Sequence, residues 1–96
     1  MKRSLATLTK HNDVSIITLD DGKANVFSYD MLSALNECLN EVPKDSGSLV
    51  IAGREGIFSG GFDLKTLGSG DVDAIIKMVS LGYKTLLELY SFPRPI

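Results

Sequence analysis

The 96-residue sequence contains one cysteine, Cys38, one histidine, His11, and no tryptophan. A single cysteine excludes an internal disulfide, so we expect a cytoplasmic protein in which Cys38 is a small core or helix-face residue. His11 precedes the turn formers Asn12 and Asp13, so we expect a solvated side chain in that turn and no histidine-based catalysis. We also expect no metal site.

Neither an excess of basic residues nor a long apolar run is present. Ten Lys and Arg residues against 12 Asp and Glu residues give a net charge of −2, which offers no electrostatic attraction to nucleic acid. The basic N-terminus lacks an apolar core and a cleavage site, and no window approaches a membrane span, so we expect neither secretion nor membrane insertion. With 44% hydrophobic residues, the composition is typical of one small globular domain over residues 1–96.

The first half of the chain predicts two strands and a helix. Apolar and polar residues alternate in Leu5–Lys10, and Val14–Leu19 is rich in β-branched residues, which together favour a β-hairpin. A helix should begin near Ser28, a suitable N-cap, and carry one apolar stripe as far as Val42, because Pro43 follows. We expect this stripe to pack on the sheet.

The second half predicts a buried strand and a long helix. Ser48–Ala52 is a short apolar run of strand length. Asp71 is a candidate N-cap for a helix with regular apolar spacing that runs to about Ser91, and Pro93–Ile96 should then be extended. Gly82 lies inside this helix at a cost of about 1 kcal/mol relative to alanine, which indicates a kink or a close contact with another helix there.

A glycine-rich loop joins the strand Ser48–Ala52 to Phe62–Lys65, a candidate first helical turn. Its four glycines fall within nine residues: Gly53, Gly56, Gly60 and Gly61. Glycines allow positive φ and close backbone approach, and free amides at a strand–turn–helix junction can bind an oxyanion or a phosphate. The spacing does not fit the dinucleotide fingerprint, and Leu64 stands where a nucleotide P-loop requires glycine. A loop whose glycines only form turns remains open on spacing alone.

The stretch GREGIFSGGFDLKTL resembles the signature of the enoyl-CoA hydratase/isomerase (crotonase) superfamily. The upstream VSIITLDDGKANVFSYDMLSALNECL is similar to the family's first strand, its Asn-containing loop and its first helix, so the resemblance covers about positions 14 to 67. Gly60 stands where the family usually has alanine. The resemblance implies an α/β fold: a crotonase-like ββα spiral unit, truncated after the first long helix pair.

The resemblance also implies a site for acyl-CoA thioesters, as in the acyl-CoA lyases and isomerases of fatty acid metabolism. The Phe62 backbone N–H corresponds to one of two amides of an oxyanion hole. Lys23, Ala24, Phe62, Asp63, Leu64 and Lys65 correspond to contacts with coenzyme A, which belongs to the substrate, so no separate cofactor is implied. Asp63 can instead be a purely structural residue at a helix N-terminus. Glu55 is expected to be solvated.

The second oxyanion amide and the acid and base residues of hydratases correspond to no position of this sequence. Two functions therefore remain. One is an acyl-CoA lyase or isomerase of the crotonase type, seen as a truncated chain or completed by a partner that supplies the missing half. The other is a non-catalytic, self-associating module that keeps part of the fold. In both cases we expect a homo-oligomer, because a three-stranded sheet and an apolar helix face would otherwise remain uncovered.

Overall fold

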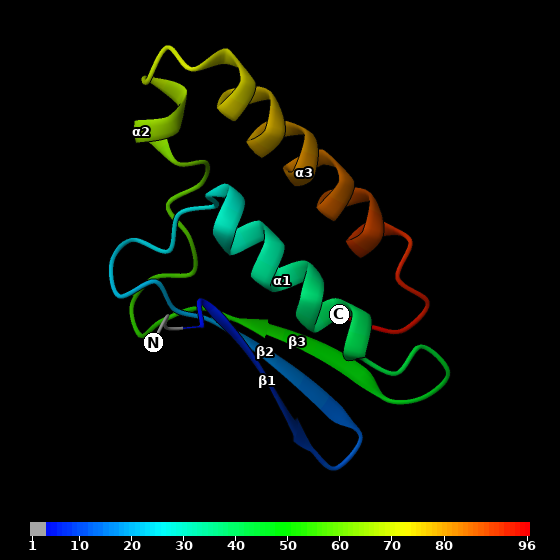
Figure 1. Ribbon diagram of the computed structural model, residues 1–96. Helices are drawn as coiled ribbons and strands as arrows, with labels where there is room; N and C mark the ends of the chain where they lie inside the picture. Colours follow the sequence, from blue (N-terminus) through cyan, green and yellow to red (C-terminus); the bar gives the residue numbers. More distant parts are fainter. Residues whose placement is uncertain (1–3) are drawn as a thin grey trace.

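The computed structural model describes residues 4–96 as a mixed α/β arrangement of three strands and three helices (Figure 1). Their order along the chain is β1 (Ala6–His11), β2 (Val14–Leu19), α1 (Tyr29–Glu41), β3 (Ser48–Ala52), α2 (Leu64–Leu67) and α3 (Val72–Tyr90). This is the predicted order of elements. In space the chain forms three layers, because α1 lies between the sheet and α3 (Figure 1).

The sheet has the order β1-β2-β3, with β1 and β2 antiparallel and β2 and β3 parallel. His11 was expected in the hairpin turn, but it is the last residue of β1 and pairs with Val14. The turn is shorter than predicted because Asn12 adopts the left-handed conformation, with φ 55°, which asparagine tolerates well. The His11 side chain is exposed, as expected.

Helix α1 covers one face of the sheet. Its N-cap is Ser28, whose hydroxyl accepts a hydrogen bond from the Met31 N–H at 3.1 Å, and the helix ends before Pro43 as predicted. The buried α1 stripe packs against the inward-facing residues of the strands, and Cys38 is one of its buried residues. The core cluster consists of Ala6, Ile17, Leu19, Met31, Leu35, Cys38, Leu39, Val42 and Leu49.

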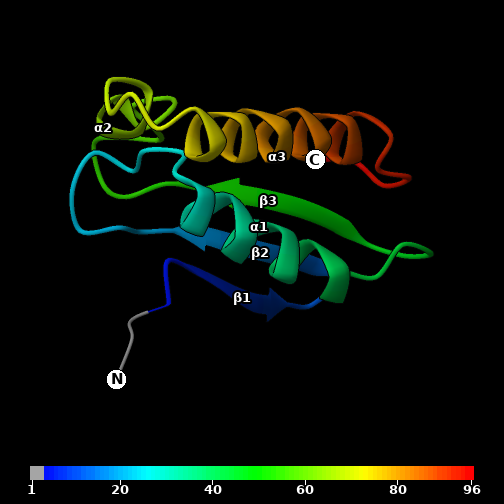
Figure 2. The same ribbon diagram turned by 45° about the horizontal axis from the view of Figure 1, so that its top comes forward.

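Helix α3 runs alongside α1, which separates it from the sheet in Figure 1; Figure 2 shows the same elements after a turn of 45°. Asp71 caps it, as predicted, by accepting a hydrogen bond from the Ala74 N–H at 3.1 Å. The Asn36 side chain on α1 donates to the Thr85 hydroxyl at 2.7 Å and joins the two helices. Only Met78 and Thr85 of α3 are fully buried, so most of its apolar stripe faces outward.

After α3 the chain returns to the free edge of β3. The Leu49 N–H donates to the Pro95 carbonyl at 2.9 Å, and the Arg94 side chain donates to the Gly47 carbonyl at 2.8 Å. The extended segment predicted at Pro93–Ile96 therefore lies beside β3. Between residues 4 and 96, no helix is long and apolar enough to cross a membrane.

Candidate functional site: a glycine-rich loop and its apolar cavity

The glycine-rich loop begins with a tight turn directly after β3. The Ile57 N–H donates to the Arg54 carbonyl at 3.1 Å, which closes the turn, and Gly56 has a φ of 83°. A Cβ at Gly53 would lie 2.5 Å from both the Ile57 carbonyl oxygen and the Phe58 Cα. Backbone atoms there cannot move aside cheaply, so any residue with a side chain would clash. Glycine at position 53 permits this close approach and fixes where the loop turns.

The second part of the loop is bonded to the segment that precedes α1. The Gly60 N–H donates to the Ala24 carbonyl at 2.8 Å, and the Phe27 N–H donates to the Gly61 carbonyl at 2.7 Å. Gly61 has a φ of 84°, which directs the chain toward Phe62. These two backbone bonds join the loop to the segment before α1.

Phe62 is the residue at which the loop and the helices meet. Within residues 4–96, the Phe62 N–H donates to no protein acceptor. The tip of its ring lies against Gly82 of α3: a Cβ at Gly82 would be 2.7 Å from both Cε1 and Cζ of Phe62. The close contact at Gly82 is therefore with the Phe62 ring and not, as was expected, with another helix, and α3 continues through it without interruption.

The helix after the loop starts later than predicted, at Leu64 and not at Phe62. Phe62 forms an isolated bridge with Phe27, and Asp63 is the N-cap. The Asp63 carboxylate accepts hydrogen bonds from the Lys65 N–H at 3.2 Å and the Thr66 hydroxyl at 2.8 Å. Asp63 therefore has the structural role at a helix N-terminus that was one of its two expected roles. Helix α2 has four residues, too few for the expected anion site at a helix N-terminus.

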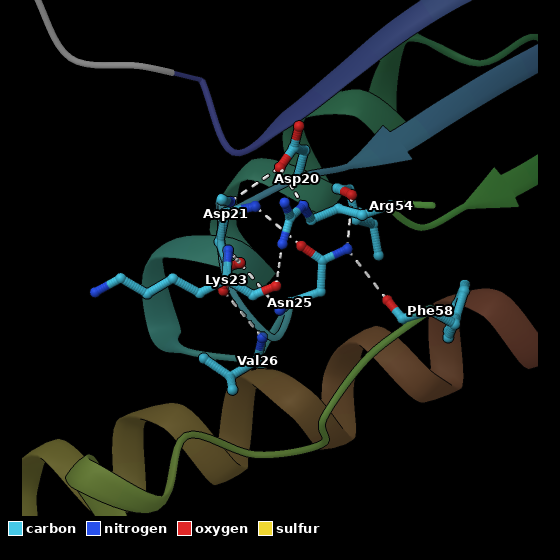
Figure 3. Close-up of polar contacts among 9 residues, drawn as sticks. Asp20, Asp21, Lys23, Asn25, Val26, Arg54 and Phe58 are labelled. Carbon is cyan, nitrogen blue, oxygen red and sulfur yellow. Dashed lines mark hydrogen bonds and ion pairs between the residues drawn. The ribbon is translucent and has the colours of Figure 1, made fainter. Parts of the chain in front are cut away.

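Asn25, in the loop before α1, connects that loop to the glycine-rich loop (Figure 3). It is fully buried and has a φ of 52°. Its side-chain amide donates to the carbonyls of Leu19 at 2.7 Å and Phe58 at 3.2 Å, and its Oδ1 accepts from the Asp21 N–H at 2.9 Å. Its backbone carbonyl accepts from the Ser59 hydroxyl at 2.7 Å. The end of β2 and the glycine-rich loop are thus held to one side chain.

Charged groups reinforce this connection. Burial alone would raise the pKa of Asp21, but hydrogen bonds from the Lys23, Asn25 and Val26 amides, together with the Arg54 charge, lower it overall. Arg54 forms an ion pair with Asp20 at 3.0 Å and also donates to the Lys23 carbonyl (Figure 3). The loop before α1 is therefore organised by polar contacts.

The predicted coenzyme A contacts lie in two groups. Lys23 and Ala24 are exposed, and the Ala24 carbonyl is bonded to the glycine-rich loop, so the structure brings these residues next to Gly60. Leu64 and Lys65 are exposed on α2, and Asp63 is half-buried in its capping role. Glu55 is exposed, as expected. Sequence reasoning did not select Asn25 or Arg54, although asparagine in a turn-prone segment is a signal for left-handed backbone.

An apolar cavity of about 300 Å³ opens between the glycine-rich loop, α1 and α3. Its walls come from these three elements and from one residue that precedes α1: Phe27, Leu32, Leu35, Gly61, Phe62, Gly82, Thr85, Leu86 and Leu89. Sequence reasoning did not predict this cavity, because its lining joins α3 to residues as distant in the sequence as Phe27, and their contact depends on how α3 packs. The only signal was Gly82 within an otherwise regular apolar stripe.

This combination of a glycine-rich loop with a free amide, a ββα unit and an adjoining cavity agrees with the comparisons to known proteins. Residues 9–96 match the family model described as enoyl-CoA hydratase/isomerase, so the chain belongs to the enoyl-CoA hydratase/isomerase family. The predicted superfamily and its α/β fold are thereby confirmed.

Individual relatives support the same assignment. The chain is similar to a solved probable enoyl-CoA hydratase from Mycobacterium tuberculosis, with 39% identity and a TM-score of 0.90 over 95% of this chain and 39% of that one. A solved enoyl-CoA hydratase from Mycobacterium ulcerans is 42% identical, with a TM-score of 0.88 over 95% of this chain and 40% of that one.

A curated relative from Bacillus subtilis, a probable enoyl-CoA hydratase, is 32% identical over 87 residues. That match covers 86% of this chain and 33% of the relative. The chain thus spans about a third of this curated relative and about two fifths of the solved ones.

Proposed function

We propose that this chain forms one part of a binding site for acyl-CoA thioesters, in which the Phe62 N–H is an oxyanion donor. One observation carries the proposal: this amide has no protein acceptor within residues 4–96, and Phe62 also lines the apolar cavity. An unbonded amide beside an apolar cavity suits a thioester, which joins a polar carbonyl to an acyl chain.

In the proposed chemistry, negative charge develops on the thioester oxygen when an enolate forms, and backbone amides stabilise that charge. Removing one donor from an oxyanion hole in other enzymes lowers the rate by about 10²–10³. This chain contributes one such donor, and no described residue is assigned as the general acid or base. We therefore expect residues 1–96, taken alone, to bind weakly and to hydrate no enoyl-CoA above background.

The remaining contacts of the proposed site divide between the acyl group and coenzyme A. The cavity of about 300 Å³ would take the acyl chain; for scale, an apolar cavity of about 150 Å³ holds benzene. Lys23 and Ala24 would contact coenzyme A beside Gly60, and Leu64 and Lys65 would contact it from α2. Because the Asp63 carboxylate is occupied by capping bonds, we assign its contact to the backbone. No separate cofactor is required.

We also propose that residues 1–96 form one domain that self-associates, with a second copy as the partner. Several α3 side chains are more than half exposed: Val72, Ile76, Tyr83, Leu86 and Tyr90. A contiguous apolar stripe of this kind is normally covered in solution. Sedimentation at high micromolar concentration tests the proposal, and a monodisperse monomer would contradict it. The cytoplasmic location expected from the single cysteine stays a prediction.

Calorimetry and a hydration assay test the proposed site together. We expect weak or absent binding of acetyl-CoA, and binding of octanoyl-CoA with a dissociation constant of roughly 1 mM, because its longer chain fills the cavity. Phe62→Pro removes the N–H and should abolish that binding, whereas Phe62→Leu keeps the N–H and should retain part of it. Equal affinity of octanoyl-CoA for the native chain and Phe62→Pro would refute the assigned donor.

The hydration assay separates the enzyme from the non-catalytic module. We expect the native chain and Phe62→Pro to be indistinguishable with crotonyl-CoA. Hydration by the native chain that is lost in Phe62→Pro would mean that a second copy completes the site, and the enzyme assignment would then hold for residues 1–96 themselves.

A further inference from the structure

Gly82 is an unfavourable residue for its place in the fold. It lies in the interior of the 19-residue helix α3, where glycine is less stable than alanine by about 1 kcal/mol. Its φ lies outside the left-handed region, so its backbone conformation does not require glycine. The reason for glycine must therefore lie in what surrounds the position.

The surroundings identify the Phe62 ring as that reason. An added Cβ at Gly82 would lie 2.7 Å from two atoms at the tip of the ring, a separation that real Cβ atoms do not show. The nearest atom of α1, Leu32 Cδ1, would be at 3.7 Å, an ordinary contact. Close packing of α3 on α1 therefore does not require glycine here, but docking of the Phe62 ring does.

The docked ring is one of two anchors that restrain the backbone of Phe62. Gly61 precedes Phe62 with a φ of 84°, and glycine by itself restrains the backbone little. The loop side of Phe62 is held through the bridge to Phe27, and the other side is held by the ring on α3. Displacement of the ring would change the lining of the cavity, to which Phe62 and Gly82 both belong, and would remove one of the two restraints on the backbone that carries the amide.

We propose that Gly82 is a positioning residue for the acyl-CoA site: its missing side chain lets the Phe62 ring dock on α3, which sets the Phe62 amide. This proposal rests on the proposed function for its consequence in binding. Its structural part, the placement of Phe62, can be measured without any ligand.

The experiment uses the 96-residue chain and compares Gly82→Ala with Ser80→Ala, an exposed position on the same helix that serves as the control. Both changes favour helix formation. Thermal unfolding, the ¹H–¹⁵N resonance of Phe62, the nuclear Overhauser effect between the Phe62 ring and the Hα of residue 82, and octanoyl-CoA affinity are measured for each.

For Gly82→Ala we expect an unchanged or higher unfolding temperature, a displaced Phe62 amide resonance and a loss of the Overhauser effect. Octanoyl-CoA affinity should fall by about tenfold, the equivalent of about 1.4 kcal/mol. Ser80→Ala should leave the Phe62 resonance and the affinity unchanged. A glycine with only a structural role would not produce equal or greater stability together with weaker binding.

A second substitution tests the ring as the cause. In the Phe62→Leu background, which keeps the amide but lacks the ring, Gly82→Ala should change affinity by less than about twofold. If Gly82→Ala does not fold, the double variant should fold, because the clash is gone. A double variant that also fails to fold would overturn the proposal.

The remaining outcomes are distinct. An unmoved Phe62 resonance and unchanged affinity in Gly82→Ala would overturn the positioning role. A displaced Phe62 amide in Gly82→Ala, together with no octanoyl-CoA binding by the native chain, would support the placement of Phe62 by Gly82 and refute the proposed acyl-CoA site.

Discussion

Helices α1 and α3 lie side by side and both carry regular apolar stripes, but they differ in how much of the stripe is covered. In α1, five of 13 residues are buried, because the sheet covers one side and α3 the other. In α3, two of 19 residues are buried, because α1 is the only large element against it within residues 4–96. Apolar spacing therefore identifies which face of a helix is apolar. It does not tell whether another part of the same 96 residues covers that face.

The walls of the apolar cavity differ in the same way, in how well the helix that forms each wall is covered. The wall formed by α1 belongs to the well-covered layer, whereas the wall formed by α3 is held by fewer contacts. Phe62 joins the two, since its backbone bridges to Phe27 and its ring lies on Gly82. The site is therefore sensitive to how α3 is placed, more than to the sheet beneath it.

The largest expected effect comes from truncating one leucine on each helix and comparing the losses in stability. Leu39 on α1 is buried and Leu87 on α3 is 50% exposed. We expect Leu39→Ala to lower the free energy of unfolding by about 3 to 5 kcal/mol, through lost burial and a cavity, and Leu87→Ala by less than about 1 kcal/mol. Urea denaturation at low protein concentration measures both. Similar losses for the two variants would contradict the difference in coverage.

The loop before α1 extends the comparison to a region held by hydrogen bonds. Asn25→Ala removes three side-chain hydrogen bonds and leaves the carbonyls of Leu19 and Phe58 without that partner. We expect a loss of about 3 kcal/mol in unfolding free energy. The control is Asn40→Ala, at an exposed α1 position, with a change within about 0.5 kcal/mol. Unfolding of both variants at the same urea concentration would contradict the connecting role assigned to Asn25.

A pH titration gives the smallest expected effect, because Asp21 is only partly buried. Its pKa is lowered on folding, so the stabilisation is present above the unfolded value of 3.8 and is lost as pH falls through the folded value. Asp21→Asn cannot carry this charge and should be less stable than the native chain at neutral pH. The gap between the two should narrow in acid. A gap that is constant from neutral to acidic pH would show that the Asp21 charge does not contribute.

Sequence reasoning was accurate where the determinants are local. Periodicity and capping residues gave the strands, α1 and α3, and the glycine-rich loop identified the candidate site. Reasoning from the sequence missed features that join distant parts of the chain: the Asn25 bonds to Phe58 and Ser59, the placement of Arg54 and the docking of Phe62 on Gly82. These depend on how β3 and α3 return beside the loop before α1, which no local pattern encodes. The late start of α2 has a local cause, the Asp63 cap.

The contact between the Phe62 N–H and a thioester oxygen is the central claim, and infrared spectroscopy tests it most directly. Octanoyl-CoA labelled with ¹³C at the carbonyl is added in excess to the native chain, to Phe62→Leu and to Phe62→Pro. A hydrogen bond weakens the C=O bond, so we predict a bound carbonyl band at lower frequency with the native chain and with Phe62→Leu, and no such band with Phe62→Pro. A shifted band of equal position and intensity with Phe62→Pro would contradict the account.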